Sequence, residues 1–496
     1  MYQDDKLLSI EEKYRYTTIP DFIKYIKREY NTLPALTDGN YSLTYNDFYS
    51  LIRKKISYIN SLNLKPHSHI GVLTNNSVEA MISFLAIPSS GNILMMIPTQ
   101  TPIYQYKAIL DKFDIDVVLG SNSFSSYSKM SNIPYLNIEE TSNDETDFID
   151  VKENDTAAIF LTGGTTSIPK GVVLSHKALL SGAYNSIVQT IYHYGSLDYL
   201  MHRRYIAMLP LSHVYGAVTG FIFGLYTGSL LMPKESITKA IEAIPTFKPN
   251  SLVLVPSILD LIFSFSDIKG SQYVDSIESV CCGATSLEER ILNKSYEKNV
   301  DLIYGYGLTE TASTFFTLFE HKTCPGSAGR ILPFQDVKVV DDELLLKGDS
   351  LFKEYYNEPE LTKSAFSDGY FHTGDLARIK DVDDKKYLML IGRKKNLIIL
   401  GNGENVSPEE LESIFIKHSE IKDCMVKQFK NEHNQIIGIE ILPNYDIFDS
   451  NADVKTKLKK IIDYENSLLP SYKQIRKLVI RDIPFEKNET TKKVRK

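Results

Sequence analysis

The stretch at residues 160–176, FLTGGTTSIPKGVVLSH, indicates both a fold class and a kind of ligand. It places glycines, hydroxyl side chains and a single lysine, Lys170, between two apolar runs. Such a loop can offer backbone amides and hydroxyl groups to phosphate oxygens, although many loops of this composition are only turns. It is not a Walker A loop, which needs Gly-Lys followed by Ser or Thr, because Pro169 and Gly171 flank the lysine.

Short apolar runs like those beside this loop alternate with helix-like segments through most of the chain. Examples are TAAIFLTG (156–163), SLVLVPS (251–257) and VDLIYGYG (300–307), each ending in Gly or Ser. This alternation predicts an α/β fold with substantial parallel sheet. Ligands bind such sheets at the carboxyl ends of the strands, and the loop after Thr162 starts at one of these ends.

From about residue 335 the apolar runs become shorter, and apolar residues alternate with polar ones, as in the strands of hairpins. The segment SPEELESIFIKH (407–418) then predicts a helix capped by Ser407. A chain of 496 residues is also too long for one ordinary core. We therefore predict a large domain over 1–392, a hinge at 393–395 and a smaller α+β domain over 396–496.

Composition argues against several other classes of protein. The net charge of −7 does not suit a dedicated nucleic-acid surface. The four cysteines have no metal-ligand spacing and two are adjacent, which fits a reducing cytoplasm. The polar, acidic start of the chain is unlike a secretory signal. The most apolar stretch, 216–232, contains interior glycines, so we expect a buried helix and no stable membrane insertion.

Five motifs follow one another along the chain: TGGTTSIPKG (162–171), YGYGLTE (304–310), YFHTGD (370–375), GRKKNLIILGNGENVSPEELE (392–412) and KNETTKKVRK (487–496). Together they resemble the adenylate-forming superfamily of acyl-CoA synthetases, aryl-CoA ligases, luciferases and stand-alone adenylation domains. The usual first motif is T-S-G-[ST]-T-G-x-P-K-G, from which Gly163 and Ser167 depart. The closing motif departs at Thr491 and Lys493, where the family has Gly and Ile.

This resemblance covers nearly the whole chain and implies both fold and activity. The implied fold is a large N-terminal domain of parallel-rich sheets with flanking helices and a small β-barrel-like part. A small, mobile α+β C-terminal domain follows it. The implied activity is that of an ATP- and Mg²⁺-dependent acid–thiol ligase. Such an enzyme forms acyl-AMP with release of pyrophosphate and then transfers the acyl group to a thiol, that of CoA in an acyl-CoA synthetase.

The resemblance assigns nucleotide-binding roles to the second motif. Tyr306, next to Gly307, would stack on adenine. Thr309 would donate a hydrogen bond to the α-phosphate. Glu310 would hold Mg²⁺, a hard cation that binds carboxylate and phosphate oxygens.

The ribose and the phosphates would be held by other motifs. Asp375 would accept hydrogen bonds from the ribose hydroxyls, and Arg393 would reach the ribose or a phosphate. We expect the loop at 162–171 to clamp the β- and γ-phosphates, with Lys170 not acting as the catalytic cation. The residues implied for the phosphate loop and the adenine pocket are Thr162, Gly163, Gly164, Thr165, Thr166, Lys170, Gly283 and Ala284.

A lysine near the C-terminus is the expected catalytic cation. A carboxylate that attacks the α-phosphate has no proton to lose, so catalysis should be positioning and electrostatic stabilisation. The family supplies the lysine for this from its closing motif. An ungapped match selects Lys492 and keeps KNET aligned, whereas a shift by one residue selects Lys493. Both assignments stay open.

The second half-reaction would use the hinge motif. Lys395 takes the position of the family's interdomain pivot, and it is followed by Asn396, where the family usually has an acidic residue. Rotation of the small domain would bring Gly403 beside a tunnel for pantetheine. The alternative for Gly403 is a simple turn.

The main indication of the substrate class comes from LPLSHVYG (209–216). This segment resembles the motif that lies beside the acyl pocket in the family. His213 would lie near the carboxylate or the tunnel mouth. Relatives that activate amino acids have an aspartate where this chain has Val214, so a fatty or aryl acid is favoured. Two alternatives remain: an enzyme that loads the phosphopantetheine of an acyl carrier protein, and a degenerate homologue that binds nucleotide or acyl groups without turnover.

Overall fold

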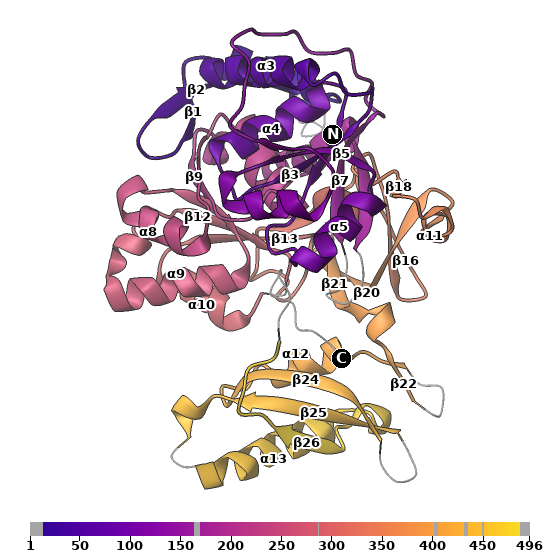
Figure 1. Ribbon diagram of the computed structural model, residues 1–496. Coiled ribbons are helices and arrows are strands. Elements are labelled where there is room, and N and C mark those ends of the chain that lie inside the picture. The colour runs from indigo at the N-terminus through magenta and orange to yellow at the C-terminus, as the bar shows by residue number, and fades with distance from the viewer. Residues whose placement is uncertain are drawn as a thin grey trace. The chain divides into compact units, whose positions relative to one another are not determined.

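The computed structural model describes residues 13–162, 169–285, 287–400, 405–430, 435–448 and 451–486 (Figure 1). The chain divides into two compact units. Unit 1 comprises Met1–Lys322, Ala328–Leu332 and Gly348–Phe366, and unit 2 comprises Thr323–Ser327, Pro333–Lys347 and Ser367–Lys496. The hinge at 393–395 stays a prediction.

The largest sheet of unit 1 is mainly parallel. Its seven strands run in the order β18-β8-β7-β4-β3-β5-β6. Pairs β3–β4, β3–β5, β4–β7 and β5–β6 are parallel, whereas β7–β8 and β8–β18 are antiparallel. The strands are β3 (His69–Leu73), β4 (Ile93–Met96), β5 (Ile115–Gly120), β6 (Tyr135–Asn137), β7 (Thr156–Thr162), β8 (Lys170–Ser175) and β18 (Glu354–Tyr355).

A second sheet, β11-β12-β13-β14, has three parallel strands and one antiparallel edge strand. Its buried aliphatic side chains form one core with those of the helices that cover it. A third sheet has the order β2-β1-β10-β9. The strands of both are β11 (Ser251–Leu254), β12 (Ser279–Gly283), β13 (Asp301–Leu308), β14 (Ser313–Leu318), β1 (Pro34–Thr37), β2 (Ser42–Thr44), β9 (Arg204–Ala207) and β10 (Leu230–Pro233).

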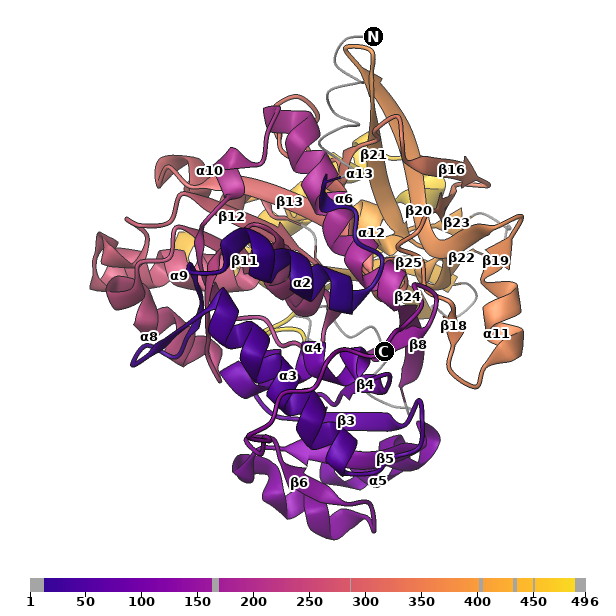
Figure 2. The ribbon, with the colours of Figure 1, turned by 90° about the horizontal axis from the view of Figure 1, so that it is seen from above.

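Helices cover the sheets of unit 1 on several sides (Figures 1 and 2). One of them, α4 (Val78–Ser89), is apolar almost all round and nearly every residue is buried, as expected of a helix enclosed in a large core. The others are α2 (Ile19–Tyr30), α3 (Tyr45–Ser61), α5 (Ile103–Lys112), α6 (His176–Tyr194), α8 (Ile237–Phe247), α9 (Pro256–Lys269), α10 (Glu289–Glu297) and α11 (Pro359–Ser364).

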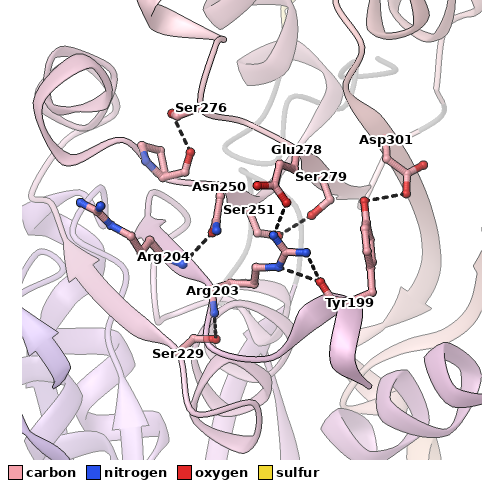
Figure 3. Close-up of polar contacts among 11 residues, drawn as sticks. Tyr199, Arg203, Arg204, Ser229, Asn250, Ser251, Ser276, Glu278, Ser279 and Asp301 are labelled. Carbon is pink, nitrogen blue, oxygen red and sulfur yellow. Dashed lines mark hydrogen bonds and ion pairs between the residues drawn. The ribbon is translucent and has the colours of Figure 1, made fainter. Parts of the chain in front are cut away.

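The amino ends of β9, β11, β12 and β13 are joined by polar contacts (Figure 3). Ser251 and Ser279, the first residues of β11 and β12, share a hydrogen bond of 2.7 Å. Tyr199 donates its hydroxyl to Asp301 at the start of β13 over 3.1 Å. These contacts fix the strand ends that lie away from the predicted nucleotide site.

The apolar stretch 216–232 is buried, but the prediction of a single helix was wrong. It forms a π-helix, η3 (Tyr215–Ile222), then α7 (Phe223–Tyr226) and then strand β10. A Cβ on Gly216 would lie 2.4 Å from the Pro210 carbonyl oxygen, so a close backbone approach shapes the start of this segment. In the described part of the chain, no helix is long and apolar enough to cross a membrane.

Unit 2 contains an open antiparallel sheet and a small α+β core. The sheet includes β16 (Asp336–Val340), β17 (Glu343–Lys347), β20 (Tyr370–Val382) and β21 (Lys385–Arg393), and it does not close into a barrel within the described residues. The α+β core packs α12 (Pro408–Phe415) and α13 (Asn451–Leu468) with β24 (Ile421–Lys430), β25 (Gln435–Pro443) and β26 (Lys477–Ile480). Ser407 caps α12, as predicted, by accepting a hydrogen bond from the Glu410 amide. The α/β fold class is thus confirmed.

We expect acid to destabilise unit 1 through His176, the first residue of α6. Burial lowers the pKa of His176 to about 4, and its Nδ1 accepts a hydrogen bond from the Ile19 amide. The neutral form is therefore favoured in the fold, and its stabilising effect is complete above pH 6.5. It is lost as the pH falls towards 4, at a cost of about 3 kcal/mol.

Thermal unfolding between pH 7 and 4 tests this expectation. The variant His176→Asn retains an acceptor but does not titrate, so its melting temperature should fall less steeply with acid. Equal slopes for the two proteins would contradict the assignment.

Candidate active site

The structure describes part of the predicted site. Thr162 ends β7 and Lys170 begins β8, and the two are paired across an antiparallel ladder. Strands β7 and β8 therefore form a hairpin, and residues 163–168 between them lie outside the described residues. The predicted site residues outside them are Gly163, Gly164, Thr165, Thr166, Gly403, Lys492 and Lys493.

Tyr355 connects two of the predicted residues in unit 1. Its hydroxyl donates to Oε1 of Glu310 over 2.9 Å, and Lys170 Nζ lies 5.4 Å from the centre of its ring. The Phe352 amide also donates to the Glu310 carbonyl oxygen at 2.9 Å. The carboxylate predicted to hold Mg²⁺ and the lysine that begins β8 thus share one aromatic neighbour. A cation over an aromatic face is a stabilising contact.

Sequence reasoning missed Tyr355, because no motif spacing relates it to Glu310. The pairing of β18 with β8, in which Tyr355 lies opposite Val172, carries it to the site. Such a pairing between distant segments has no local sequence signal.

The turn after β13 has the close backbone geometry that its glycines allow. A Cβ on Gly307 would lie 1.7 Å from the Ser313 carbonyl oxygen, so only glycine fits there. Thr309 and Glu310 open the short helix η5 (Thr309–Thr311). Ser313 has φ of +98°, which is uncommon for a residue with a side chain and is typical of functional sites.

Tyr306 is buried beside another aromatic ring, and its stacking on adenine stays a prediction. It is 8% exposed, and its ring stacks on Phe316 with 6.0 Å between centroids. Gly283, on the neighbouring strand, could not take a side chain, because a Cβ would lie 2.9 Å from the Gly305 carbonyl oxygen. Ala284 follows with φ of +68°. The predicted adenine-pocket segments therefore end adjacent strands.

His213 lies in the loop between β9 and η3 and is largely desolvated. Burial lowers the pKa of His213, so its imidazole is neutral near pH 7. Two residues on, Tyr215 donates its hydroxyl to the Cys281 carbonyl oxygen over 2.9 Å. This bond ties the start of η3 to β12.

A small cavity, with an accessible volume of about 30 Å³, lies near these residues in unit 1. It is formed between one face of the second sheet and the helical segments α6 and η3. Its described lining is uncharged and combines apolar with hydroxyl side chains. The lining residues are Ser186, Thr190, Leu200, Tyr205, Thr219, Phe223, Ser251, Leu252, Val253, Cys281, Ile303, Thr314, Thr317 and Phe319.

In unit 2 the two predicted ribose-binding residues form an ion pair. Arg393 Nε lies 2.5 Å from Asp375 Oδ1, and Asp375 is 5% exposed. They face each other across β20 and β21. The arginine offsets the charge of the buried carboxylate and orients it. The sequence analysis assigned the two residues to separate motifs and did not predict this ion pair.

The segment around the predicted hinge is tied to α12. Ser407 donates its hydroxyl to the Ile391 carbonyl oxygen over 2.8 Å, and Asn396 Nδ2 donates to Glu409 Oε1 over 2.6 Å. The side-chain amide of Asn396 thus donates a hydrogen bond to a carboxylate. An aspartate at this position could do so only if it were protonated. The pivot role of Lys395 stays a prediction.

Comparison with known proteins gives matches over nearly the whole chain. The family model described as AMP-binding enzyme matches residues 25–356, and that of the AMP-binding enzyme C-terminal domain matches 395–495. The 4-coumarate:CoA ligase 1 of Petunia hybrida is 28% identical, with 91% of this chain and 88% of that protein covered. The long-chain-fatty-acid–CoA ligase FadD13 of Mycobacterium tuberculosis is 28% identical, with 89% of each covered.

Solved structures show the same fold. The o-succinylbenzoate CoA synthetase of Bacillus subtilis, in complex with the acyl-adenylate OSB-AMP, has a TM-score of 0.79 at 20% identity, with 96% of each chain covered. Its complex with ATP and magnesium ion has a TM-score of 0.78 at 20% identity, with 95% of this chain and 98% of that chain covered.

Proposed function

The chain belongs to the AMP-binding enzyme family, and from this premise we propose that it joins a fatty or aryl acid to the thiol of CoA with conversion of ATP to AMP and pyrophosphate. The arrangement of Lys170, Tyr355 and Glu310 carries the proposal. A carboxylate and a lysine lie beside one aromatic ring, near the carboxyl ends of strands in unit 1, and α/β sheets bind ligands at such ends.

The first step forms a bond between a carboxylate oxygen and the α-phosphorus of ATP. The bond from that phosphorus to the bridging oxygen breaks, and pyrophosphate leaves. Thr309 orients the α-phosphate, while Asp375 and Arg393 hold the ribose. Lys492 or Lys493 stabilises the charge on the attacking and bridging oxygens, and no protein group has to remove a proton.

The second step forms a bond between the thiol sulfur and the acyl carbon. The bond from this carbon to the phosphate oxygen breaks, AMP leaves, and the thiol proton passes to solvent. Gly403 borders the path of the pantetheine arm. The long-chain and coumarate ligases among the relatives support CoA as the acceptor, and loading of a carrier protein is the alternative.

The residues at Glu310 fit Mg²⁺. Among the described residues, no cluster of three or more His, Cys, Asp or Glu side chains could hold a metal ion by itself. Mg²⁺ is commonly held by one or two carboxylates together with substrate phosphates, which is what Glu310 and bound ATP would offer. When bound, the ion neutralises phosphate charge and orients the leaving pyrophosphate.

The acid lies with its carboxylate near the neutral His213. A neutral imidazole can donate a hydrogen bond to the carboxylate without holding it as a strong ion pair. Val214 offers no partner for an α-amino group. The proposed enzyme acts in the cytoplasm, which agrees with four cysteines that form no disulfide.

Pyrophosphate exchange into ATP tests the proposed function. We expect exchange that depends on Mg²⁺ and on an added fatty or aryl acid, followed by AMP release when CoA is supplied. A product that appears only with an acyl carrier protein would replace CoA as the acceptor. Absence of exchange with every acid would indicate a binding protein without turnover.

We expect Tyr355→Phe to raise the half-saturating Mg²⁺ concentration by about tenfold, because a hydrogen bond to a charged group is lost. The ring beneath Lys170 remains, so the melting temperature should change little. The matched control is Tyr356→Phe, in which the lost hydroxyl donates to Asp114 over 2.7 Å, away from the site. Equal Mg²⁺ dependence of the two variants would show that the Tyr355 hydroxyl does not contribute to Mg²⁺ binding.

A further inference from the structure

We propose that Glu343 is a positioning residue for the ribose of the nucleotide, because its carboxylate sets the shape of the backbone that carries Asp375. The inference rests on the proposed function, in which Asp375 and Arg393 hold the ribose. It adds a residue that lies outside the five motifs, and three contacts of this one buried side chain in unit 2 carry it.

Asp375 lies in a bulge of strand β20. Glu343 of β17 pairs with Leu376 of β20. The next pair joins Leu345 to His372, so one residue of β17 lies opposite three of β20, 373–375. Extra residues in one strand release backbone groups from the ladder and re-aim side chains, as bulges commonly do beside active sites.

Glu343 takes up a backbone amide that this bulge releases. The Gly374 amide donates to Oε1 of Glu343 over 3.1 Å, and Gly374 has φ of +69°, a conformation that favours glycine. Thr373 donates its hydroxyl to the Leu344 carbonyl oxygen over 2.8 Å, and the Asp375 amide donates to that hydroxyl over 3.0 Å. The bulge is thus tied to β17 by a carboxylate and by a backbone carbonyl.

The other carboxylate oxygen of Glu343 is held by two side chains. Lys394 Nζ lies 2.8 Å from Oε2, and His372 Nδ1 lies 3.3 Å from the same oxygen. Ser367 Oγ lies 2.6 Å from His372 Nε2. A neutral imidazole can accept from this hydroxyl while its Nδ1 donates to the carboxylate, so both ring nitrogens have a role.

The charge of Glu343 suits this arrangement. The side chain is 6% exposed, and burial alone would raise the pKa of Glu343, but hydrogen bonds and charges from its two side-chain partners hold it below the usual value. It is therefore an anion near pH 7. Gly374 precedes Asp375 and Lys394 follows Arg393, so one carboxylate contacts the sequence neighbours of both ribose-binding residues.

Glu343→Gln disturbs these contacts with almost no change in size. Glutamine has a single acceptor oxygen, so it can satisfy either the Gly374 amide or Lys394 but not both. Its NH₂ group would face a donor instead. We expect the bulge to lose its fixed shape and Asp375 to hold the ribose hydroxyls less well.

Equilibrium binding of AMP and of 2′,3′-dideoxy-AMP, measured by calorimetry, tests the inference. Only AMP has ribose hydroxyls for Asp375, so the unaltered protein should bind AMP about tenfold more tightly. In Glu343→Gln this ratio should fall towards one through weaker binding of AMP. Lys394→Met keeps the Gly374 contact and removes a mostly exposed cation, so it should lower the ratio only about threefold.

Pyrophosphate exchange gives a second measurement. In Glu343→Gln, KM for ATP should rise by about tenfold with little change in kcat, because a ribose contact that is equal in the ground state and the transition state alters KM alone. A general loss of folded protein would instead lower the apparent kcat.

Glu440→Gln is the matched control. Glu440 of β25 is also buried and also held by two cations, Lys427 and Arg481, but it belongs to the other sheet of unit 2. It should leave the AMP ratio unchanged. Equal binding of both nucleotides by the unaltered protein, equal weakening of both in Glu343→Gln, or an unchanged ratio in that variant would overturn the inference and leave the proposed function standing. Failure of the proposed function would show separately, as absence of pyrophosphate exchange with every acid, and the AMP ratios would still decide the role of Glu343.

Discussion

Lys492→Ala is expected to slow acyl-adenylate formation by a factor of about 10²–10³, the usual effect of removing one preorganised group that stabilises developing charge. The attacking carboxylate and the α-phosphate are both anionic, and this lysine is proposed to offset their repulsion. The measurement is acid-dependent pyrophosphate exchange. Thiolysis of supplied acyl-AMP should be nearly unaffected, because the lysine acts only in the first half-reaction.

Lys493→Ala is the matched control for this prediction. It removes the same charge one residue along the chain and should retain exchange activity. The reverse pattern would assign the role to Lys493, in keeping with the alternative alignment of KNETTKKVRK. Full activity in both variants would exclude a catalytic lysine in the tail.

Glu310→Gln is expected to lower kcat/KM for MgATP by a similar factor of about 10²–10³. Glutamine retains the size of the side chain and an oxygen that can accept from the Tyr355 hydroxyl. The variant therefore isolates the negative charge that Mg²⁺ needs. Kinetic titration with Mg²⁺ should show a much weaker dependence on the ion.

A suitable control is Glu354→Gln, which removes one negative charge at an exposed position next to Tyr355. Its Mg²⁺ dependence should match that of the unaltered protein. Unchanged Mg²⁺ dependence in Glu310→Gln would show that another group holds the ion.

Local sequence signals predicted much of this structure. Apolar runs ending in Gly or Ser marked the parallel strands, because buried strands need continuous apolar side chains. Ser407 was predicted as a helix cap from its spacing to Glu410, and the structure shows that bond.

Features that depend on distant segments could not be predicted. Tyr355 reaches Glu310 only through the pairing of β18 with β8, and Asp375 meets Arg393 only across β20 and β21. The helix expected over 216–232 failed because the period of the apolar residues does not reveal a π-helix followed by a strand.

The fate of the carboxylate oxygen tests the central claim most directly. When the acid labelled with ¹⁸O in its carboxylate is converted with ATP and CoA, attack on the α-phosphate transfers one labelled oxygen to AMP. We predict one ¹⁸O atom in each AMP formed and none in pyrophosphate. Label in inorganic phosphate together with ADP, or AMP without label, would contradict an acyl-adenylate and with it the proposed function.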